Sequence, residues 1–154
     1  MSTPASQAAA MPRPISRPAL AFAFSAVTTC LAGAAAAQDW ALEGYDPVGF
    51  QDQGRAVPGR ADIHTMWKGN LWLFANDQHR LAFESNPRAY VPGFDGLCPV
   101  ALSDGREEKG DPRFFVVIGD RLYLTRSDSA RHTLMSTPRD VLNDARRHFA
   151  ATGH

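Results

Sequence analysis

The stretch IHTMWKGNLWLF, residues 63–74, decides the fold. β-Branched and aromatic side chains dominate it, and a Gly-Asn pair at 69–70 interrupts it near the middle. Such a pair between two apolar runs is typical of a two-residue β-turn. The pattern therefore predicts a hairpin in which Trp67 faces Trp72 across the turn, with the large aromatic side chains on one face and in the core.

A second run of the same kind occupies residues 114–124. Its two parts, FFVVI and RLYL, are separated by a Gly-Asp pair at 119–120. This composition predicts a second hairpin. Residues 44–50, GYDPVGF, are expected to form a turn that leads into a short strand, with Asp46 capping neighbouring amides.

Helix signals follow each hairpin. Asn76 is a suitable N-cap for a helix over residues 77–85, which Pro87 would stop. Thr137, followed by proline and an acidic residue, predicts a helix that reaches about Phe149. There is no regular βαβ alternation, and no internal repeat is expected. We therefore predict a small single α+β domain with two β-hairpins and two to three helices.

The N-terminal 37 residues have the composition of a secretory signal peptide. A polar, basic start is followed by the apolar run ALAFAFSAVTTCLA and then by small residues. The apolar run is too short and too rich in alanine for a membrane span. We expect residues 1–37 to be removed on export to the periplasm. Residues 38–154 would then remain as a secreted domain with no membrane attachment.

Charge and length limit the classes of function. The whole chain has 16 basic and 16 acidic residues. Arg13 and Arg17 are the only charged residues in the first 37, so the exported part has two more acidic than basic residues. A chain without basic excess is not expected to bind nucleic acid.

Several short motifs, in a fixed order, resemble the exported branch of the YHS-domain family. They are GYDPV at 44–48, WxGxxWxFA at 67–75, RxxF at 80–83, NPxxYxP at 86–92, GxC at 96–98, ALS at 101–103, GDP at 110–112 and LYL at 122–124. The spacing holds over roughly eighty residues, which is far more specific than any single piece. The resemblance, which extends to TRASH-like relatives, implies a role in handling heavy metals, copper above all.

The sequence departs from the metal-binding members of that family at one point. Those relatives carry cysteines at two separated positions, whereas this chain has YDPV at 45–48 and only the later cysteine, Cys98. Its other cysteine, Cys30, lies in the predicted signal peptide. A site with several cysteines from one exported chain is therefore excluded, as is an intramolecular disulfide.

A metal site centred on Cys98 would need other ligands. His64 and Met66 lie two residues apart on a predicted strand and so share a face, and thiolate, thioether and imidazole suit Cu(I). We therefore expect Cys98, His64 and Met66 to be the metal ligands, with His79 as a further candidate. The histidines after residue 130 are expected to be solvated.

Three interpretations of Cys98 remain open at this stage. It is a metal ligand, a buried small apolar residue, or the nucleophile of a thiol enzyme. No motif for catalysis or nucleotide binding is present in the chain. We therefore predict an exported binding module that takes up copper in metal homeostasis or tolerance and is not an enzyme. The alternative is a metal-free structural or interaction module, with a protein partner and a buried Cys98.

Overall fold

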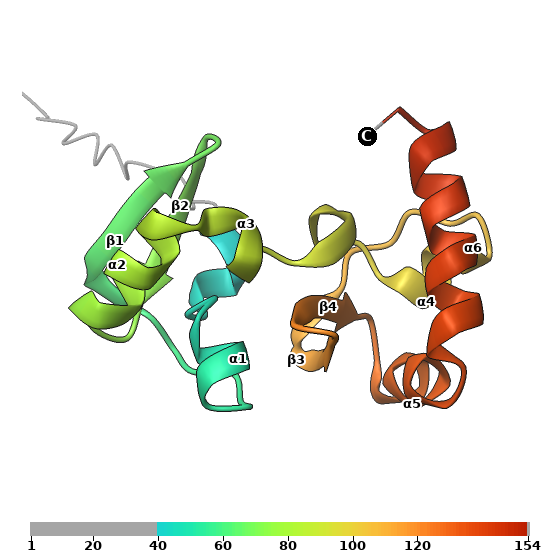
Figure 1. Cartoon of the computed structure of the whole chain (residues 1–154), viewed down its shortest axis with the longest axis horizontal. Coiled ribbons are helices and arrows are strands. Elements are labelled where there is room, and N and C mark those ends of the chain that lie inside the picture. The colour runs from blue at the N-terminus through green and yellow to red at the C-terminus, as the bar shows by residue number, and fades with distance from the viewer. Residues whose placement is uncertain (1–39, 154) are drawn as a thin grey trace, which may run out of the picture. The chain divides into compact units, whose positions relative to one another are not determined.

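The computed structural model describes residues 40–153 (Figure 1). The predicted signal peptide lies outside the described residues. In the first hairpin, β1 (Arg60–Trp67) pairs with the antiparallel β2 (Asn70–Phe74), and Trp67 faces Asn70. The turn is therefore at Lys68 and Gly69, so the predicted facing of Trp67 and Trp72 was wrong. Both turn residues have positive φ, 48° and 78°, as a type I′ turn requires.

The second hairpin has the predicted position and turn. β3 (Asp111–Ile118) pairs with β4 (Arg121–Thr125), and Ile118 faces Arg121. The turn residues Gly119 and Asp120 have φ of 55° and 59°. Asp tolerates this left-handed conformation better than most residues, which explains why the Gly-Asp pair marks the turn.

Among residues 40–153, three helices have nine residues or more, and short helices and 3₁₀ turns join them to the strands. The elements are η1 (Ala41–Gly44), α1 (Gly49–Asp52), α2 (Asp77–Ser85), α3 (Pro87–Tyr90), η2 (Gly93–Gly96), α4 (Pro99–Ser103), α5 (Asp128–Ser136) and α6 (Pro138–Ala151). The predicted α+β class and its two hairpins are confirmed. The short strand expected near residues 48–50 was wrong, because α1 begins there.

The described residues consist of two halves that repeat the same series of elements, contrary to the expectation of no repeat. Each half has a 3₁₀ turn, a short helix, an eight-residue strand, a five-residue strand and a nine-residue helix in that order. A proline then opens the next helix, at Pro87 in the first half and at Pro138 in the second. The chain is therefore a structural duplication with a period of roughly 50 residues.

The backbone hydrogen bonds repeat as well as the elements. The Gly59 N–H donates to the Gly44 carbonyl over 2.8 Å, and the Gly110 N–H donates to the Gly96 carbonyl over the same distance. Each 3₁₀ turn has two consecutive residues in the left-handed region, Leu42 and Glu43 in η1 and Phe94 and Asp95 in η2. Such conformations are uncommon outside glycine, so their recurrence supports a true duplication.

Each half has its own apolar core. Trp72, Phe74 and Phe83 form the first with Val48, while Tyr123 and Leu134 anchor the second with residues of α6. A third cluster joins the halves, because Phe50 from α1 packs with Leu122 and Leu124 from β4. Among the described helices, none is long and apolar enough to cross a membrane.

Candidate functional site

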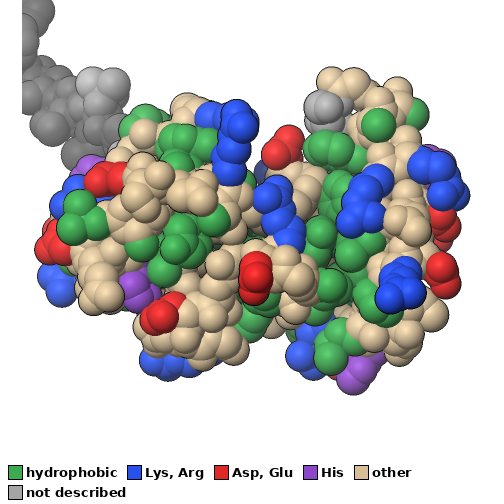
Figure 2. Space-filling view, in the orientation of Figure 1, with side chains coloured by type: hydrophobic (Ala, Val, Ile, Leu, Met, Phe, Trp, Pro, Cys, Tyr) green, Lys and Arg blue, Asp and Glu red, His purple; other side chains and the backbone are tan. Residues whose placement is uncertain are grey.

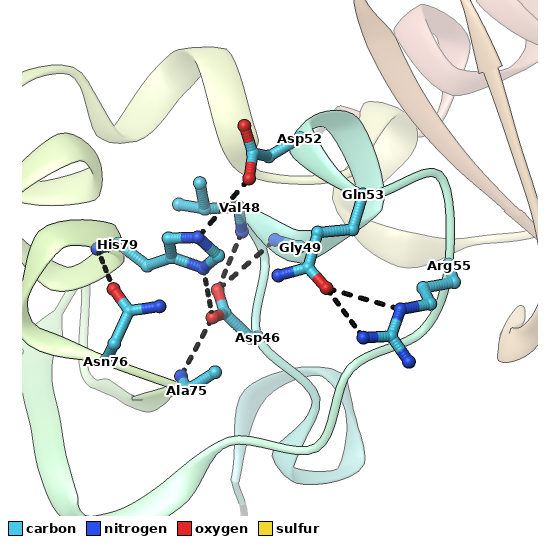
Figure 3. Close-up of polar contacts among 9 residues, drawn as sticks. All are labelled: Asp46, Val48, Gly49, Asp52, Gln53, Arg55, Ala75, Asn76 and His79. Atoms are coloured by element: carbon cyan, nitrogen blue, oxygen red, sulfur yellow. Dashed lines mark hydrogen bonds and ion pairs between the residues drawn. The ribbon is translucent and has the colours of Figure 1, made fainter.

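The most elaborate polar site in the described residues is centred on Asp46, which follows η1. Its carboxylate is fully buried. One oxygen accepts from the Val48 N–H over 2.9 Å and from the Gly49 N–H over 3.4 Å, and the other accepts from the Ala75 N–H over 2.8 Å (Figure 3). Asp46 therefore caps neighbouring amides, as the sequence predicted, but it does so at the start of a helix, α1, and it also joins that segment to the end of β2.

His79, in the first turn of α2, completes this arrangement. Its Nδ1 lies 2.6 Å from the Asp46 oxygen that also accepts from Ala75, and its side chain is 8% exposed. A carboxylate only accepts, so Nδ1 carries the proton and donates. Asn76 holds the helix start in place by accepting from the His79 N–H over 2.8 Å. Two residues far apart in sequence thus form a buried, hydrogen-bonded pair.

The opposite ring nitrogen of His79 faces a small cleft. Its Nε2 lies 3.6 Å from a carboxylate oxygen of Asp52, which is 64% exposed (Figure 3). The cleft measures about 470 Å³ and is lined by α1, α2 and Tyr90, with Asp120 from the second hairpin turn. An imidazole held by a buried carboxylate is an arrangement used both for metal ligation and for proton transfer.

Two features that such centres often have are absent from the described residues around His79. The residues that line the cleft include no serine, threonine or cysteine that could act as a nucleophile. Within residues 40–153, no three side chains of His, Cys, Asp or Glu come close enough together to hold a metal ion. The hydrogen bonds of the Asp46–His79 pair join the start of α1, the end of β2 and the first turn of α2.

Cys98 occupies in the second half the position that Asp46 occupies in the first. The Cys98 N–H donates to the Glu108 carbonyl over 2.8 Å, as the Asp46 N–H donates to the Val57 carbonyl over 2.8 Å. Cys98 is fully buried and unpaired, and it packs with Ala101 and Ala130. A proline and a valine follow in each half.

The partner of Cys98 shows how the two halves differ. Ala130 occupies the place in α5 that His79 has in α2, three residues after the N-cap. The second half therefore has a thiol against a methyl group where the first has a carboxylate against an imidazole. Cys98 makes no side-chain hydrogen bond to cap α4. The environment of the thiol is that of a small apolar residue.

The structure does not bring the predicted metal ligands together. His64 and Met66 lie on β1 and share an exposed face, as the sequence predicted. Met66 is 65% exposed, and His64 Nδ1 lies 2.8 Å from the Ala61 carbonyl oxygen. β1 pairs with β2 and packs on α2, whereas the segment after Cys98 packs on α5, α6 and β4. The surroundings of Cys98 do not fit a copper site formed by these three residues.

Sequence reasoning missed the duplication and, with it, the pairing of Asp46 with His79. The signal was present in the recurrence of Gly-x-x-Pro-Val at 44–48 and 96–100. The two hairpins with a capped helix after each would have supported it. Aligning the two halves would have matched Cys98 with Asp46, which was predicted to cap neighbouring amides. That match would have indicated a structural role for Cys98, which the sequence around the thiol alone does not show.

These observations define a class of protein, a small α+β domain built from two copies of one hairpin-helix unit, with a polar pair buried in one copy only. In comparisons with known proteins, no family model, no curated protein and no solved structure matches the chain.

Proposed function

We propose that this chain is an exported, non-catalytic binding module of the YHS type in which Cys98 is a core residue rather than a metal ligand. Export rests on the pattern of residues 1–37, and the YHS type rests on the ordered motifs between Gly44 and Leu124. The observation that carries the proposal is the burial of Cys98 against Ala101 and Ala130, at the position equivalent to a structural aspartate.

The chemistry of copper binding opposes a role for this thiol as a ligand. A Cu(I) site needs an accessible thiolate and at least one further soft or imidazole ligand. Cys98 has no exposed surface, and it packs in an apolar cluster with Val100, Ala101 and Ala130, whose side chains carry no ligand atom. Loading a metal would require this cluster to open and bring in a ligand from another part of the fold.

The same burial argues against a thiol enzyme. A cysteine nucleophile needs access to substrate and a base within hydrogen-bond reach. Cys98 is fully buried and belongs to an apolar cluster with Ala101 and Ala130, where access to a substrate is blocked. Binding, rather than turnover, is the function that the described surfaces support.

Copper titration tests the proposal directly. The chain is purified from the periplasm of an expressing bacterium, titrated anaerobically with Cu(I) and analysed for bound metal, beside Cys98→Ala and Met66→Leu variants. We expect no stoichiometric copper in any of the three. One equivalent of copper in the unaltered chain that the Cys98→Ala variant lacks would overturn the proposal and restore the copper-binding module.

A further inference from the structure

A groove of about 750 Å³ lies where the two halves meet. It is bounded by η1 and the first hairpin on the side of the first half, and by η2, the start of β3 and part of β4 on the side of the second. Volumes of this size are typical of sites for small molecules. The groove is separate from the cleft beside His79, because the two share no lining residue.

Four cationic side chains line the groove: Lys68, Arg88, Lys109 and Arg121. None of the four forms an ion pair with a carboxylate in the part of the chain that the structure describes. Arg121 donates to the Arg88 carbonyl over 3.0 Å, and the Lys68 ammonium lies 5.0 Å from the centroid of the Trp67 ring. Figure 2 shows Lys and Arg side chains beside hydrophobic ones on the face that it draws.

The absence of ion pairs distinguishes these cations from most arginines outside the groove. Seven other arginines each lie within ion-pair distance of an aspartate or glutamate: Arg60, Arg80, Arg106, Arg113, Arg126, Arg131 and Arg147. The four groove cations therefore have N–H donors that form no ion pair with a carboxylate in the described residues and that could bind an anionic ligand. Two acidic residues, Glu43 and Asp95, also line the groove, which leaves its lining with a net charge of +2.

Aromatic surface lies beside these charges. Trp40, Trp67 and Trp72 line the groove. Trp67 is only partly buried, and its ring meets that of Trp72 edge-on with centroids 6.1 Å apart. Indole faces stack with planar rings, and guanidinium and ammonium groups bind carboxylate, sulfonate and phosphate oxygens.

We propose that the groove binds a small molecule in which a planar apolar ring carries an anionic group. The tryptophans would contact the ring, and the unpaired cations would bind the anion. This inference rests on the proposed binding function and names its ligand class. The ligand proposal does not involve Cys98. A failure of the probe-binding test would therefore overturn the ligand class alone, whereas a positive copper titration would overturn the proposed function.

The test uses two fluorescent probes that differ only in charge. 8-Anilinonaphthalene-1-sulfonate carries a sulfonate, and N-phenyl-1-naphthylamine is the same ring system without it. We expect the folded chain to bind the sulfonate at least about tenfold more tightly than the neutral probe. Raising the salt concentration should weaken binding of the sulfonate and leave that of the neutral probe unchanged.

Matched variants locate the site. Arg88→Gln and Lys109→Gln should each weaken sulfonate binding by about tenfold, whereas Arg139→Gln, an exposed arginine on α6 outside the groove, should not change it. Circular dichroism checks that each variant is folded. Equal affinity for the two probes, or equal affinities in the groove and control variants, would overturn the proposal. The salt comparison on the unaltered chain decides the matter if a variant fails to fold.

Discussion

At Asp46, three backbone N–H groups and one imidazole converge on a single buried carboxylate. Moving a charged group from water into the protein interior is costly, and only a full set of hydrogen-bond partners offsets that cost. The donors come from α1, β2 and α2, so one side chain fixes three segments. At the same position of the second half, Cys98 needs no such donors because a thiol is easily buried without them.

This difference predicts unequal effects at equivalent positions. Asp46→Ala should lower the free energy of unfolding by about 3–5 kcal/mol, because it leaves three amides and His79 without their acceptor. Cys98→Ala should lower it by about 1 kcal/mol, because it removes one sulfur atom from an apolar cluster. Urea denaturation monitored by tryptophan fluorescence measures both values.

Asp52→Asn is the control for Asp46. It removes the carboxylate 3.6 Å from His79 Nε2 but leaves the buried pair intact. Because Asp52 is mostly exposed, we expect a change below about 1 kcal/mol. A loss as large as that of Asp46→Ala would mean that the outer carboxylate, and not the buried one, holds the site together.

At the scale of elements, the duplication predicts that one glycine in each half has the same role. A Cβ added at Gly59 would lie 2.4 Å from the Leu73 Cβ, and one added at Gly110 would lie 2.4 Å from the Leu124 Cβ. The first residue of each long strand follows this glycine, where the chain crosses close against the neighbouring strand. Gly59→Ala and Gly110→Ala should each lower stability by about 3 kcal/mol, since backbone must move in both.

Gly54→Ala provides the comparison for these two variants. Gly54 has a φ of 62° but open space around it, so only the left-handed conformation would be strained, at about 1 kcal/mol. Thermal unfolding of the three variants ranks them by stability, and we expect Gly54→Ala to be the most stable of the three. A mild effect at Gly110 with a severe one at Gly59 would contradict the equivalence of the halves.

An ion pair at the start of β3 predicts a dependence on pH. Arg113 donates to Asp111 over 2.9 Å from Nε, and these hydrogen bonds hold the pKa of the Asp111 carboxyl below its ordinary value. A carboxyl whose pKa is lower in the folded than in the unfolded chain stabilises the fold at pH values above its unfolded pKa of about 4. This stabilisation is lost as the pH falls through the pKa of the folded chain.

Asp111→Asn should therefore be less stable than the unaltered chain at pH 7, by under about 1 kcal/mol because the guanidinium is exposed. The difference should disappear in strong acid. Denaturation curves for both chains at several pH values measure it. A difference that persists below the lowered pKa would show that Asp111 acts through its shape rather than its charge.

Much of this fold could be predicted from local patterns. Turn pairs, N-caps and prolines located the hairpins and the helices α2 and α6, because these signals act between neighbouring residues. The first turn was misplaced by one residue. Lys68-Gly69 and Gly69-Asn70 are both plausible turn pairs, and only the backbone conformation shows which of them forms the turn. The Asp46–His79 pair could not be found this way, because it joins residues on different elements that meet only in the folded chain.

At the scale of the whole described region, the apolar cluster around Phe50 joins the two halves, so they should unfold together. Phe50 from α1 is fully buried and meets the Phe115 ring from β3 edge-on, with centroids 4.9 Å apart. Gln51 also donates across the halves, to the Asp120 carbonyl over 3.2 Å. Because of these contacts, we expect the two halves to unfold as a single cooperative structure.

Phe50→Ala should therefore destabilise the whole chain by about 3–5 kcal/mol. In the unaltered chain, tryptophan fluorescence reports on the first half and near-ultraviolet circular dichroism includes Tyr123 of the second. The two probes should give one coincident unfolding transition. Two separate transitions in the unaltered chain would show that the halves fold independently.

The accessibility of Cys98 tests the central claim most directly. The rate of alkylation of residues 38–154 by iodoacetamide at neutral pH is measured in native buffer, in native buffer with Cu(I), and in denaturant. A core thiol should be labelled very slowly in native buffer, at the same rate with Cu(I), and rapidly once the chain is unfolded. Rapid labelling of the native chain, with protection by one equivalent of Cu(I), would contradict the account and identify Cys98 as a metal ligand.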